Sequence, residues 1–472
     1  MSEILWTAQE LVSIDAKFLP EVRPDFSVNG ISIDSRSVKP GELFVALRSA
    51  RDGHEFVNAA IAAGACAALV DHVPDATTGA PLLIVEDTLK GLERLGGKAR
   101  ERSSALRIAV TGSVGKTGTK EALKIALGAS GKTHASESSY NNLWGVPLTL
   151  ARMPRESAYG VFEIGMNHSG EITPLSLQVR PQAAIITTVE PVHLEFFDSV
   201  EEIAEAKAEI FAGLELGGTA ILNLDNPHFA RLKMRAEQAH ARIVGFGEHP
   251  DADARLVSIE LGPEGSKIRA RILGTDVSYE LSSPGRHVAR NSLAVLAGVS
   301  VLGADVGHAA HALSALKPAP GRGVRTQIAF AGGAVTLIDE SYNANPASMR
   351  AAIANLALLA SKGGRRIVVL GDMLELGPRG AELHSALVDA VEAARIDLVY
   401  LCGPLMKHLY DRLPVSRRGA YAPSSAELAP QITASLRVGD AVMIKGSLGS
   451  RMKYIVDRVR AMDETPKTAS GG

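Results

Sequence analysis

The chain has 472 residues, which is more than one ordinary hydrophobic core accommodates, so we expect two to four domains. Its 50 basic and 52 acidic side chains leave a net charge of −2 and form no basic stripe, which argues against a nucleic-acid surface. The chain has two cysteines, no apolar run long enough to span a bilayer and no signal-peptide pattern, so the composition predicts a cytoplasmic protein that does not insert into membranes.

The first block, residues 1–104, has the pattern of a smaller α/β domain. Strand-like runs ISIDSRSV, ELFVAL, CAALV and LLIVE are interrupted by an alanine-rich helical stretch near residues 57–63. The triplet Asp34-Ser35-Arg36 in this block is, by itself, equally consistent with an ordinary turn.

The second block, residues 105–316, opens with the most informative segment of the chain. An apolar run at residues 107–110 leads into TGSVGKT, and a helical apolar pattern follows. Strand, glycine-rich turn and helix in this order are typical of a phosphate-binding loop, in which backbone N–H groups and the helix N-terminus face an anion. Lys116 would contact the terminal phosphates of ATP, and the Thr117 hydroxyl would bind Mg²⁺. The loop backbone is supplied by Gly112, Ser113, Val114 and Gly115.

The loop is shorter than the common Walker pattern, because Val110 stands where that pattern has its first glycine. A turn with an incidental Lys-Thr pair is therefore the alternative interpretation. Beyond the loop, apolar strands such as GVFEIG, AAIITTV and TAILNLD alternate with helical segments. This alternation predicts a doubly wound, mostly parallel sheet in a central P-loop domain.

Two further residues of the second block follow predicted strands, which is where ligands bind in sheets of this kind. Glu163 ends the run GVFE, and His193 follows the strand predicted at residues 183–189. With Thr117 they would offer oxygen and imidazole ligands to Mg²⁺. Taken alone, Glu163 is equally consistent with a solvated charge at a strand end, and His193 with a surface or core histidine.

Lys207 is an anomaly in the helix predicted over residues 200–214. It lies on the same helix face as the apolar residues Val200, Ile203, Ile210 and Leu214. An unpaired ammonium on a buried stripe is costly, so the lysine either extends its charge to the surface or has its charge matched or changed inside a site. A buried lysine with a lowered pKa is nucleophilic. Reaction with CO₂ would convert it into a carbamate, an anionic oxygen ligand suited to Mg²⁺.

The third block, residues 317–472, begins at the Pro/Gly-rich junction KPAPGRG. Apolar strands VTLID, RIVVLGD, DLVYLC and AVMIKG alternate with Ala/Leu-rich helices, which predicts a second, Rossmann-like open α/β sheet. A G-x-G-x-x-G fingerprint is missing from this block, so no dinucleotide cofactor is expected. Arg322 in the junction is, by itself, consistent with a solvated linker residue.

These motifs in this order closely resemble the Mur ligases, the ATP-dependent amino-acid ligases of bacterial cell-wall synthesis, over essentially the whole chain. The resemblance is carried by TGSVGKT, SSYNNLWGVPLTL from residue 138, FEIGMNHSGEI from Phe162, PVHLEFF, EAKAEIF around Lys207, GRHVARN from Gly285, PGRG around Arg322, DESYNANPASM from Asp339, GDMLELG from Gly371 and KGS at Lys445. The last four are similar to those of the member that adds a dipeptide. Two departures are Gly118, where the family usually has another threonine, and SLGSRMK after KGS.

The resemblance implies a three-domain monomer that joins D-alanyl-D-alanine to a UDP-linked muramoyl tripeptide, with ATP and two Mg²⁺ ions. It implies that Lys116, His193 and Lys207 are catalytic, and that Lys207 is carbamylated and shares a Mg²⁺ with Glu163 and His193. For the nucleotide it assigns Asn291 to adenine, Arg322 to the phosphates and Asp339 to the ribose. For the two other substrates it assigns Asp34, Ser35, Arg36, Gly53, His54, Asn141, Asn142, Tyr342, Asn343, Asn345, Lys445 and Ser447.

Two other interpretations stay open at this point. A ligase of the folylpolyglutamate type would share the chemistry, but the segments at residues 34–36 and 342–346 argue against it. A nucleotide-hydrolysing switch would need neither Lys207 on a buried face nor a large third block. Such a switch also commonly carries an Asn-Lys-x-Asp motif, which this sequence lacks.

Overall fold

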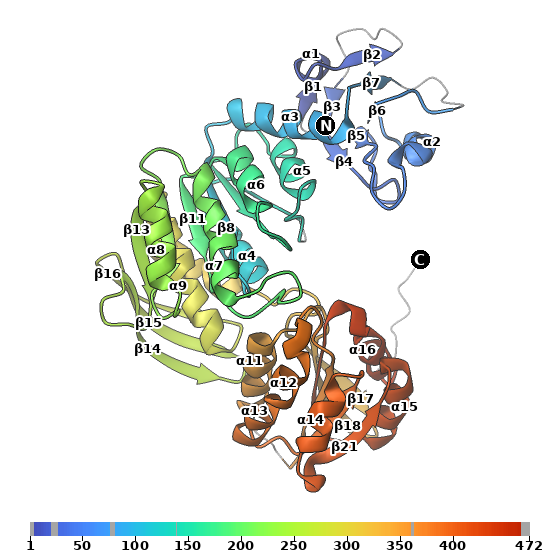
Figure 1. Ribbon diagram of the computed structural model, residues 1–472, viewed down its shortest axis with the longest axis vertical. Helices are drawn as coiled ribbons and strands as arrows, with labels where there is room; N and C mark the ends of the chain where they lie inside the picture. Colours follow the sequence, from blue (N-terminus) through green and yellow to red (C-terminus); the bar gives the residue numbers. More distant parts are fainter. Residues whose placement is uncertain (1–3, 20–26, 76–80, 138, 360–362, 464–472) are drawn as a thin grey trace.

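The structure is a computed structural model that describes residues 4–19, 27–75, 81–137, 139–359 and 363–463. Three α/β bodies follow one another along its longest axis, in chain order from the N-terminal part at the top of Figure 1 to the C-terminal part at the bottom. Each body is built on a sheet of its own, which confirms the predicted three-domain α/β class. The boundaries proposed at residues 104 and 316 stay predictions.

The N-terminal body contains a five-stranded sheet in the order β2-β7-β6-β5-β4. Its strands are β2 (Lys17–Leu19), β4 (Gly30–Ser32), β5 (Glu42–Val45), β6 (Ala67–Val70) and β7 (Leu82–Ile84). Only β2 runs antiparallel to its neighbour. A short ribbon joins β1 (Trp6–Thr7) to β3 (Ser27–Val28), and the helices are α1 (Ala8–Val12), α2 (Val57–Ala62) and α3 (Thr88–Glu101).

The central body is a nine-stranded sheet in the order β16-β15-β14-β13-β12-β11-β8-β10-β9. Its strands are β8 (Leu106–Thr111), β9 (Thr133–Ala135), β10 (Tyr159–Glu163), β11 (Ala183–Ile186), β12 (Thr219–Asn223), β13 (Arg242–Gly247), β14 (Ala254–Gly262), β15 (Gly265–Ile272) and β16 (Thr275–Leu281). One face is covered by α4 (Lys116–Gly128), α9 (Arg286–Val301) and α10 (Val306–Ala312). The other face is covered by α5 (Gly145–Ala151), α6 (Ile172–Val179), α7 (Val200–Ala208) and α8 (Phe229–Gln238).

The order of the central strands determines where a ligand can bind. From β8 the chain passes to the edge strand β9, returns to β10 beside β8, and then crosses to β11 on the other side of β8. These strands are parallel, so the loops after β8, β10 and β11 emerge at the same edge of the sheet. Such a reversal of strand order leaves a crevice at the carboxyl ends of the strands.

The edge of the central sheet is antiparallel, an addition that the mostly parallel prediction did not specify. Strands β14, β15 and β16 form a meander through the turns at residues 263–264 and 273–274. Buried and exposed side chains alternate along β15, which is the period of a strand with one covered face. That face packs on the core shared with α9.

The C-terminal body is a six-stranded sheet in the order β17-β18-β22-β19-β20-β21, in which only β17 is antiparallel. Its strands are β17 (Val324–Phe330), β18 (Gly333–Glu340), β19 (Arg366–Gly371), β20 (Leu398–Cys402), β21 (Arg418–Ala422) and β22 (Ala441–Lys445). Helices α11 (Pro346–Ala357), α12 (Gly380–Ser385), α13 (Leu387–Ala393) and α14 (Met406–Arg412) cover one face. Helices α15 (Ser425–Ser435) and α16 (Lys453–Arg460) cover the other. Across the described ranges, no helix combines the length and apolar character needed to cross a membrane.

Gly118 in the first turn of α4 offers a test of local stability. It is exposed, its backbone is not left-handed, and a Cβ built on it would meet no atom within 4 Å. We expect Gly118→Ala to raise the free energy of unfolding by about 0.5–1 kcal/mol, because glycine loses more backbone entropy in a helix. Thermal denaturation measures this change. Gly115→Ala is the matched control and should lower the melting temperature, because Gly115 has φ +88° and its Cβ would collide with Asn291.

Candidate active site

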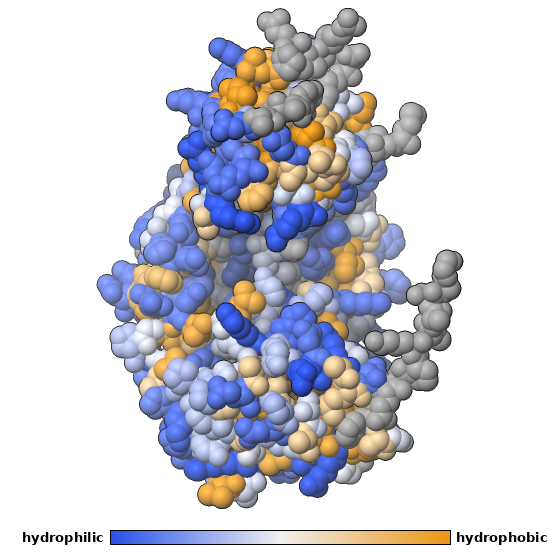
Figure 2. Space-filling model, turned by 90° about the vertical axis from the view of Figure 1, so that its right-hand side faces the viewer, coloured by the Kyte–Doolittle hydropathy of each residue, from blue (hydrophilic) through white to orange (hydrophobic). Residues whose placement is uncertain are grey.

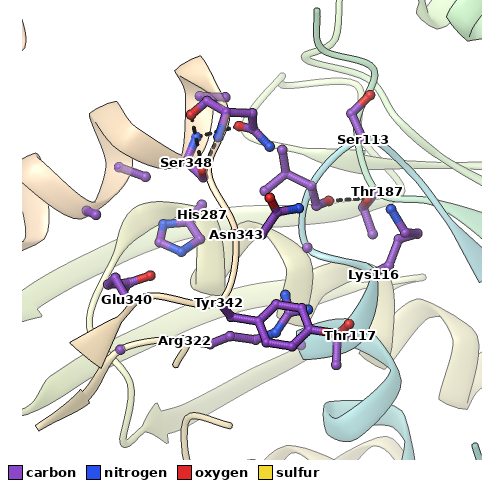
Figure 3. A pocket seen from close by; sticks show the side chains of 18 of the residues that line it. Ser113, Lys116, Thr117, Thr187, His287, Arg322, Glu340, Tyr342, Asn343 and Ser348 are labelled. Carbon is purple, nitrogen blue, oxygen red and sulfur yellow. Dashed lines mark hydrogen bonds between the residues drawn. The ribbon is translucent and has the colours of Figure 1, made fainter. Parts of the chain in front are cut away.

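A cavity of about 950 Å³ lies between the central and C-terminal bodies. The face shown in Figure 2 is hollowed between the upper and lower parts of the molecule. The close view in Figure 3 shows Lys116 and Thr117 on one side of the cavity, with Arg322, Tyr342 and Asn343 across from them. The cavity therefore joins the predicted phosphate loop to residues more than 200 positions later in the chain.

The predicted phosphate loop connects β8 to α4 and depends on two glycines. Gly112 and Gly115 have φ of +147° and +88°, and added Cβ atoms would collide with Thr187 and Asn291. The Lys116 Nζ donates a hydrogen bond of 2.7 Å to the Gly112 carbonyl. The Thr187 hydroxyl donates one of 2.6 Å to the Val114 carbonyl and fixes the loop to β11. Lys116 thus lies folded over a loop whose geometry suits an anion.

The surroundings of Lys116 lower its pKa. Removal from water lowers the pKa of Lys116, while the carboxylate of Glu163 raises it and the guanidinium of Arg322 lowers it. The pKa of Lys116 is therefore affected by charges of both the central and the C-terminal body. A phosphate group bound in the loop would provide a negative partner for its ammonium.

Glu163 lies at the last position of β10, where the sequence predicted it, and only 1% of its surface is exposed. Its Oε1 accepts hydrogen bonds from the Thr117 hydroxyl (3.2 Å) and from Asn141 Nδ2 (2.7 Å). Its Oε2 is buried and has no hydrogen-bond partner among the described residues. A buried carboxylate oxygen without a donor is costly, and a cation beside it would remove that cost. Thr117 and Glu163 therefore fit a divalent metal ion.

His193 lies in the loop after β11, on the wall of the same cavity. Its Nδ1 is 2.6 Å from the Oε2 of Glu375, which belongs to the C-terminal body. The hydrogen bond with His193 lowers the pKa of the Glu375 carboxyl. His193 therefore lies at the cavity and has a partner, Glu375, in the C-terminal body.

Lys207 lies in the last turn of α7, and only 2% of its surface is exposed. The alternative in which its charge reaches solvent is therefore wrong in this structure. Burial lowers the pKa of Lys207 well below its usual 10.5, and the nearby charge of Lys116 lowers it further. No hydrogen bond or ion pair of its ammonium is found among the residues that the structure describes, and the only charge that shifts its pKa is that of Lys116. A neutral, nucleophilic amine is what reaction with CO₂ requires, although Lys207 is not one of the residues that line the cavity.

The C-terminal side of the cavity is an organised polar surface. The Arg322 guanidinium lies 4.3 Å from the ring centroid of Tyr342, whose hydroxyl donates to the Ser139 Oγ at 3.4 Å. The buried Lys445 donates to the Asn343 carbonyl at 2.9 Å and to Glu340 Oε2 at 3.3 Å. The predicted site residues that line the cavity are Ser113, Val114, Gly115, Lys116, Thr117, Asn141, Glu163, His193, Asn291, Arg322, Tyr342, Asn343, Asn345, Lys445 and Ser447.

Other predicted residues lie away from this cavity. Asp339 is buried, with one oxygen bonded to Ser341 and the other 3.0 Å from Arg460. The next residue, Glu340, lines the cavity instead, so contact between Asp339 and a ribose stays a prediction. Asn142 is not on the wall, and its Oδ1 accepts from the Gly145 N–H at the start of α5. Gly112 is likewise not on the wall.

The five residues predicted in the first block form a separate group in the N-terminal body. Asp34 and Arg36 form a two-point ion pair with distances of 2.7 and 2.9 Å, and the hydrogen bond from Arg36 lowers the pKa of Asp34 to about 2. Ser35 lies between them in the same turn. Gly53 begins a short 3-10 helix, and His54 is buried within it, its Nδ1 2.5 Å from Asp52.

Sequence reasoning missed Glu340, Glu375 and His287, all of which line the cavity. Glu340 is the last residue of β18, so the strand-end argument used for Glu163 could have found it. Burial lowers the pKa of His287 to about 4, which keeps its ring neutral. No sequence signal pairs Glu375 with His193, because the two residues lie in different domains.

Comparison with known proteins follows the same division of the chain. Family models match at residues 27–97 (Mur ligase family, catalytic domain), 110–299 (Mur ligase middle domain) and 324–448 (Mur ligase, glutamate ligase domain). The UDP-N-acetylmuramoyl-tripeptide--D-alanyl-D-alanine ligase of Rickettsia prowazekii is 34% identical over 93% of this chain and 96% of its own length. The chain belongs to the Mur ligase family. The Escherichia coli ligase of the same name is also 34% identical, over 93% of this chain and 95% of its own.

Solved structures of Mur ligases share the whole architecture. MurF from Acinetobacter baumannii superposes with a TM-score of 0.84 at 30% identity, over 97% of this chain and 99% of its own. MurF ligase from Thermotoga maritima, solved in complex with ADP, has a TM-score of 0.77 at 25% identity, over 92% and 98% of the two chains. The fold class predicted from the sequence is confirmed by these likenesses.

Proposed function

We propose that this Mur ligase is an ATP-dependent enzyme that joins D-alanyl-D-alanine to UDP-N-acetylmuramoyl-tripeptide. The observation that carries the ligase chemistry is the buried group near the phosphate loop. There a Glu163 oxygen has no hydrogen-bond partner among the described residues, and the buried Lys207, whose pKa is lowered, lies in one domain with Lys116 and Thr117. The substrates are inferred from the relatives named UDP-N-acetylmuramoyl-tripeptide--D-alanyl-D-alanine ligase, which match over nearly their whole length. The proposal includes a cytoplasmic, monomeric enzyme.

The reaction proceeds in two steps. A carboxylate oxygen of the tripeptide attacks the γ-phosphorus of ATP, the bond to the bridging oxygen breaks, and an acyl phosphate and ADP result. The amine of the dipeptide then attacks the acyl carbon, and phosphate leaves from the tetrahedral intermediate after the nitrogen loses a proton. Lys116 and the N–H groups of residues 112–117 hold the transferring phosphoryl group and stabilise its charge.

The metal ligands we propose are Thr117, Glu163, His193 and the carbamate of Lys207. The free Glu163 oxygen and the low pKa of Lys207 are the features that fit a pair of Mg²⁺ ions and carbamylation. Bound Mg²⁺ neutralises phosphate charge and lowers the cost of its redistribution. The protein's part is to keep Lys207 neutral and free of partners, so that its nitrogen can take up CO₂ and release a proton.

The remaining residues divide between three binding functions. We assign adenosine and phosphate contacts to Asn291, Arg322 and Asp339. The incoming dipeptide is assigned to the polar surface of the C-terminal body, which includes Tyr342, Asn343, Asn345, Lys445 and Ser447, with Asn141 and Asn142 on the facing side. The UDP group is assigned to the N-terminal group Asp34, Ser35, Arg36, Gly53 and His54. The cavity between two domains would also shield an acyl phosphate from water.

Two alternatives have weaker support. A folylpolyglutamate-type ligase shares the fold, since the FPGS of L. casei has a TM-score of 0.54, but at 15% identity that likeness shows the fold alone. A nucleotide switch would not need the buried Lys207 or the polar surface opposite the phosphate loop.

Phosphate release from ATP and Mg²⁺ tests the proposal. We expect release to require both UDP-N-acetylmuramoyl-tripeptide and D-alanyl-D-alanine, with the pentapeptide product detected by mass. Release without any carboxylate substrate would favour a switch, and release with folate and glutamate alone would favour the other ligase. Sedimentation of the same sample reports the oligomeric state.

A further inference from the structure

Another side-chain contact between the central and C-terminal bodies, besides Tyr342–Ser139, lies at the cavity wall. The Nδ1 of His193, in the loop after β11, lies 2.6 Å from the Oε2 of Glu375, in the loop after β19. Both residues have left-handed backbones, with φ of 56° and 63°. Residues other than glycine adopt this conformation rarely, so the surrounding structure holds both loops in the shape that this contact needs.

The two loops also meet through their backbones and through a shared apolar residue. The Glu195 N–H donates to the Glu375 carbonyl at 3.2 Å. Leu194, between these two contacts, packs against buried residues of both bodies. At Gly377 the approach is so close that a Cβ would lie 3.0 Å from the Leu194 carbonyl oxygen. The His193–Glu375 pair is therefore one of several contacts between the two loops, and not an isolated surface ion pair.

The contact with Glu375 affects which ring nitrogen of His193 can bind a metal ion. A neutral imidazole carries one N–H and one lone pair. When a neutral ring donates from Nδ1 to Glu375, its lone pair is on Nε2, and the His193 Nε2 has no hydrogen bond to any described residue. Histidines that bind metals commonly donate their other N–H to a carboxylate, which fixes the tautomer and the orientation of the ring.

We propose that Glu375 is a positioning residue for His193. Supplied by the C-terminal body, it fixes the imidazole as an Nε2 ligand, so the metal site of the central body is complete only when the two bodies are docked as they are here. Glu375 acts through His193 and does not itself bind the metal. This inference rests on the proposed function, because that proposal assigns His193 to a metal ion.

Binding of Mn²⁺ to the full chain with a non-hydrolysable ATP analogue, followed by electron paramagnetic resonance, tests the inference. We expect Glu375→Ala to lower the affinity for one of the bound Mn²⁺ ions by about 10- to 100-fold. Glu375→Gln should stay within about threefold of the wild type, because the amide oxygen accepts the same hydrogen bond. Glu382→Ala is the matched control and should leave Mn²⁺ binding unchanged. Glu382 lies at the surface of the same body, and its carboxylate pairs with Arg379 and with no other described residue.

A double-mutant cycle separates positioning from a general loosening of the fold. His193→Ala should weaken the same ion, and adding Glu375→Ala to it should have no further effect. Wild-type Mn²⁺ affinity in Glu375→Ala, or additive losses in the double variant, would overturn the inference. Because Mn²⁺ binding does not depend on the carboxylate and amine substrates, a wild-type enzyme that binds Mn²⁺ as expected but makes no pentapeptide would contradict only the proposed function.

Discussion

Lys207→Ala should lower the rate of ligation on the order of 1000-fold, because it removes the anionic ligand that the carbamate would provide. A small carboxylate such as acetate, added to the variant, should restore part of the activity by occupying the space that the shortened side chain leaves. The measurement is phosphate release at saturating substrates, with and without the carboxylate. Full activity of Lys207→Ala without rescue would refute the carbamate role.

The stability of a second variant tests the buried, unpaired state of Lys207 directly. Without CO₂, Lys207→Met should raise the free energy of unfolding at neutral pH by roughly 1–3 kcal/mol, because an uncompensated polar group leaves the interior. The matched control is Lys120→Met, which should be destabilising, because the buried Lys120 bonds Glu121 at 2.6 Å and the Ser136 carbonyl at 2.7 Å.

The gain from Lys207→Met should also depend on pH. The folded-state pKa of Lys207 lies below the unfolded value of 10.5, so between these two values the unfolded chain binds more protons and the stability of the wild type rises with pH. The increase in the free energy of unfolding caused by Lys207→Met is thus largest below the folded-state pKa and vanishes as pH approaches 10.5. Denaturation at several pH values in CO₂-free buffer measures it, and a gain that grows with pH would contradict the assignment.

Glu163→Gln should reduce ATP-dependent acyl-phosphate formation by roughly 100- to 1000-fold while leaving the melting temperature unchanged or higher. The amide oxygen can keep the hydrogen bonds from Thr117 and Asn141, but the charge at the free oxygen is lost. Rapid-quench detection of the first step, at a series of Mg²⁺ concentrations, should show a raised requirement for the metal.

Glu205→Gln is the control for this change. Glu205 lies on α7, two residues before Lys207, but its carboxylate pairs with Arg231 and Arg235 rather than with the site. Its loss should leave the rate within about threefold, since exposed ion pairs contribute little. Equal effects of the two substitutions would mean that Glu163 has no special role with the metal.

The local features of this protein could be predicted from its amino-acid sequence. The phosphate loop was identifiable because its chemistry depends on neighbouring residues, namely two glycines and a Lys-Thr pair at a helix start. Lys207 stood out because a helix has a fixed period of 3.6 residues, which placed its charge on an apolar face. Glu163 could be predicted because it ends a strand, and the carboxyl ends of parallel strands lie at one edge of the sheet.

Which of these groups have partners depends on how distant parts of the chain pack together. The free Oε2 of Glu163 and the burial of Lys207 depend on what packs around them from distant elements. The structure also placed Glu340 rather than Asp339 on the cavity wall, a difference of one position that reverses the face of a strand. The His193–Glu375 contact joins residues 182 positions apart in two domains. No local pattern encodes such a contact, because it arises only when two separately folded sheets dock against each other.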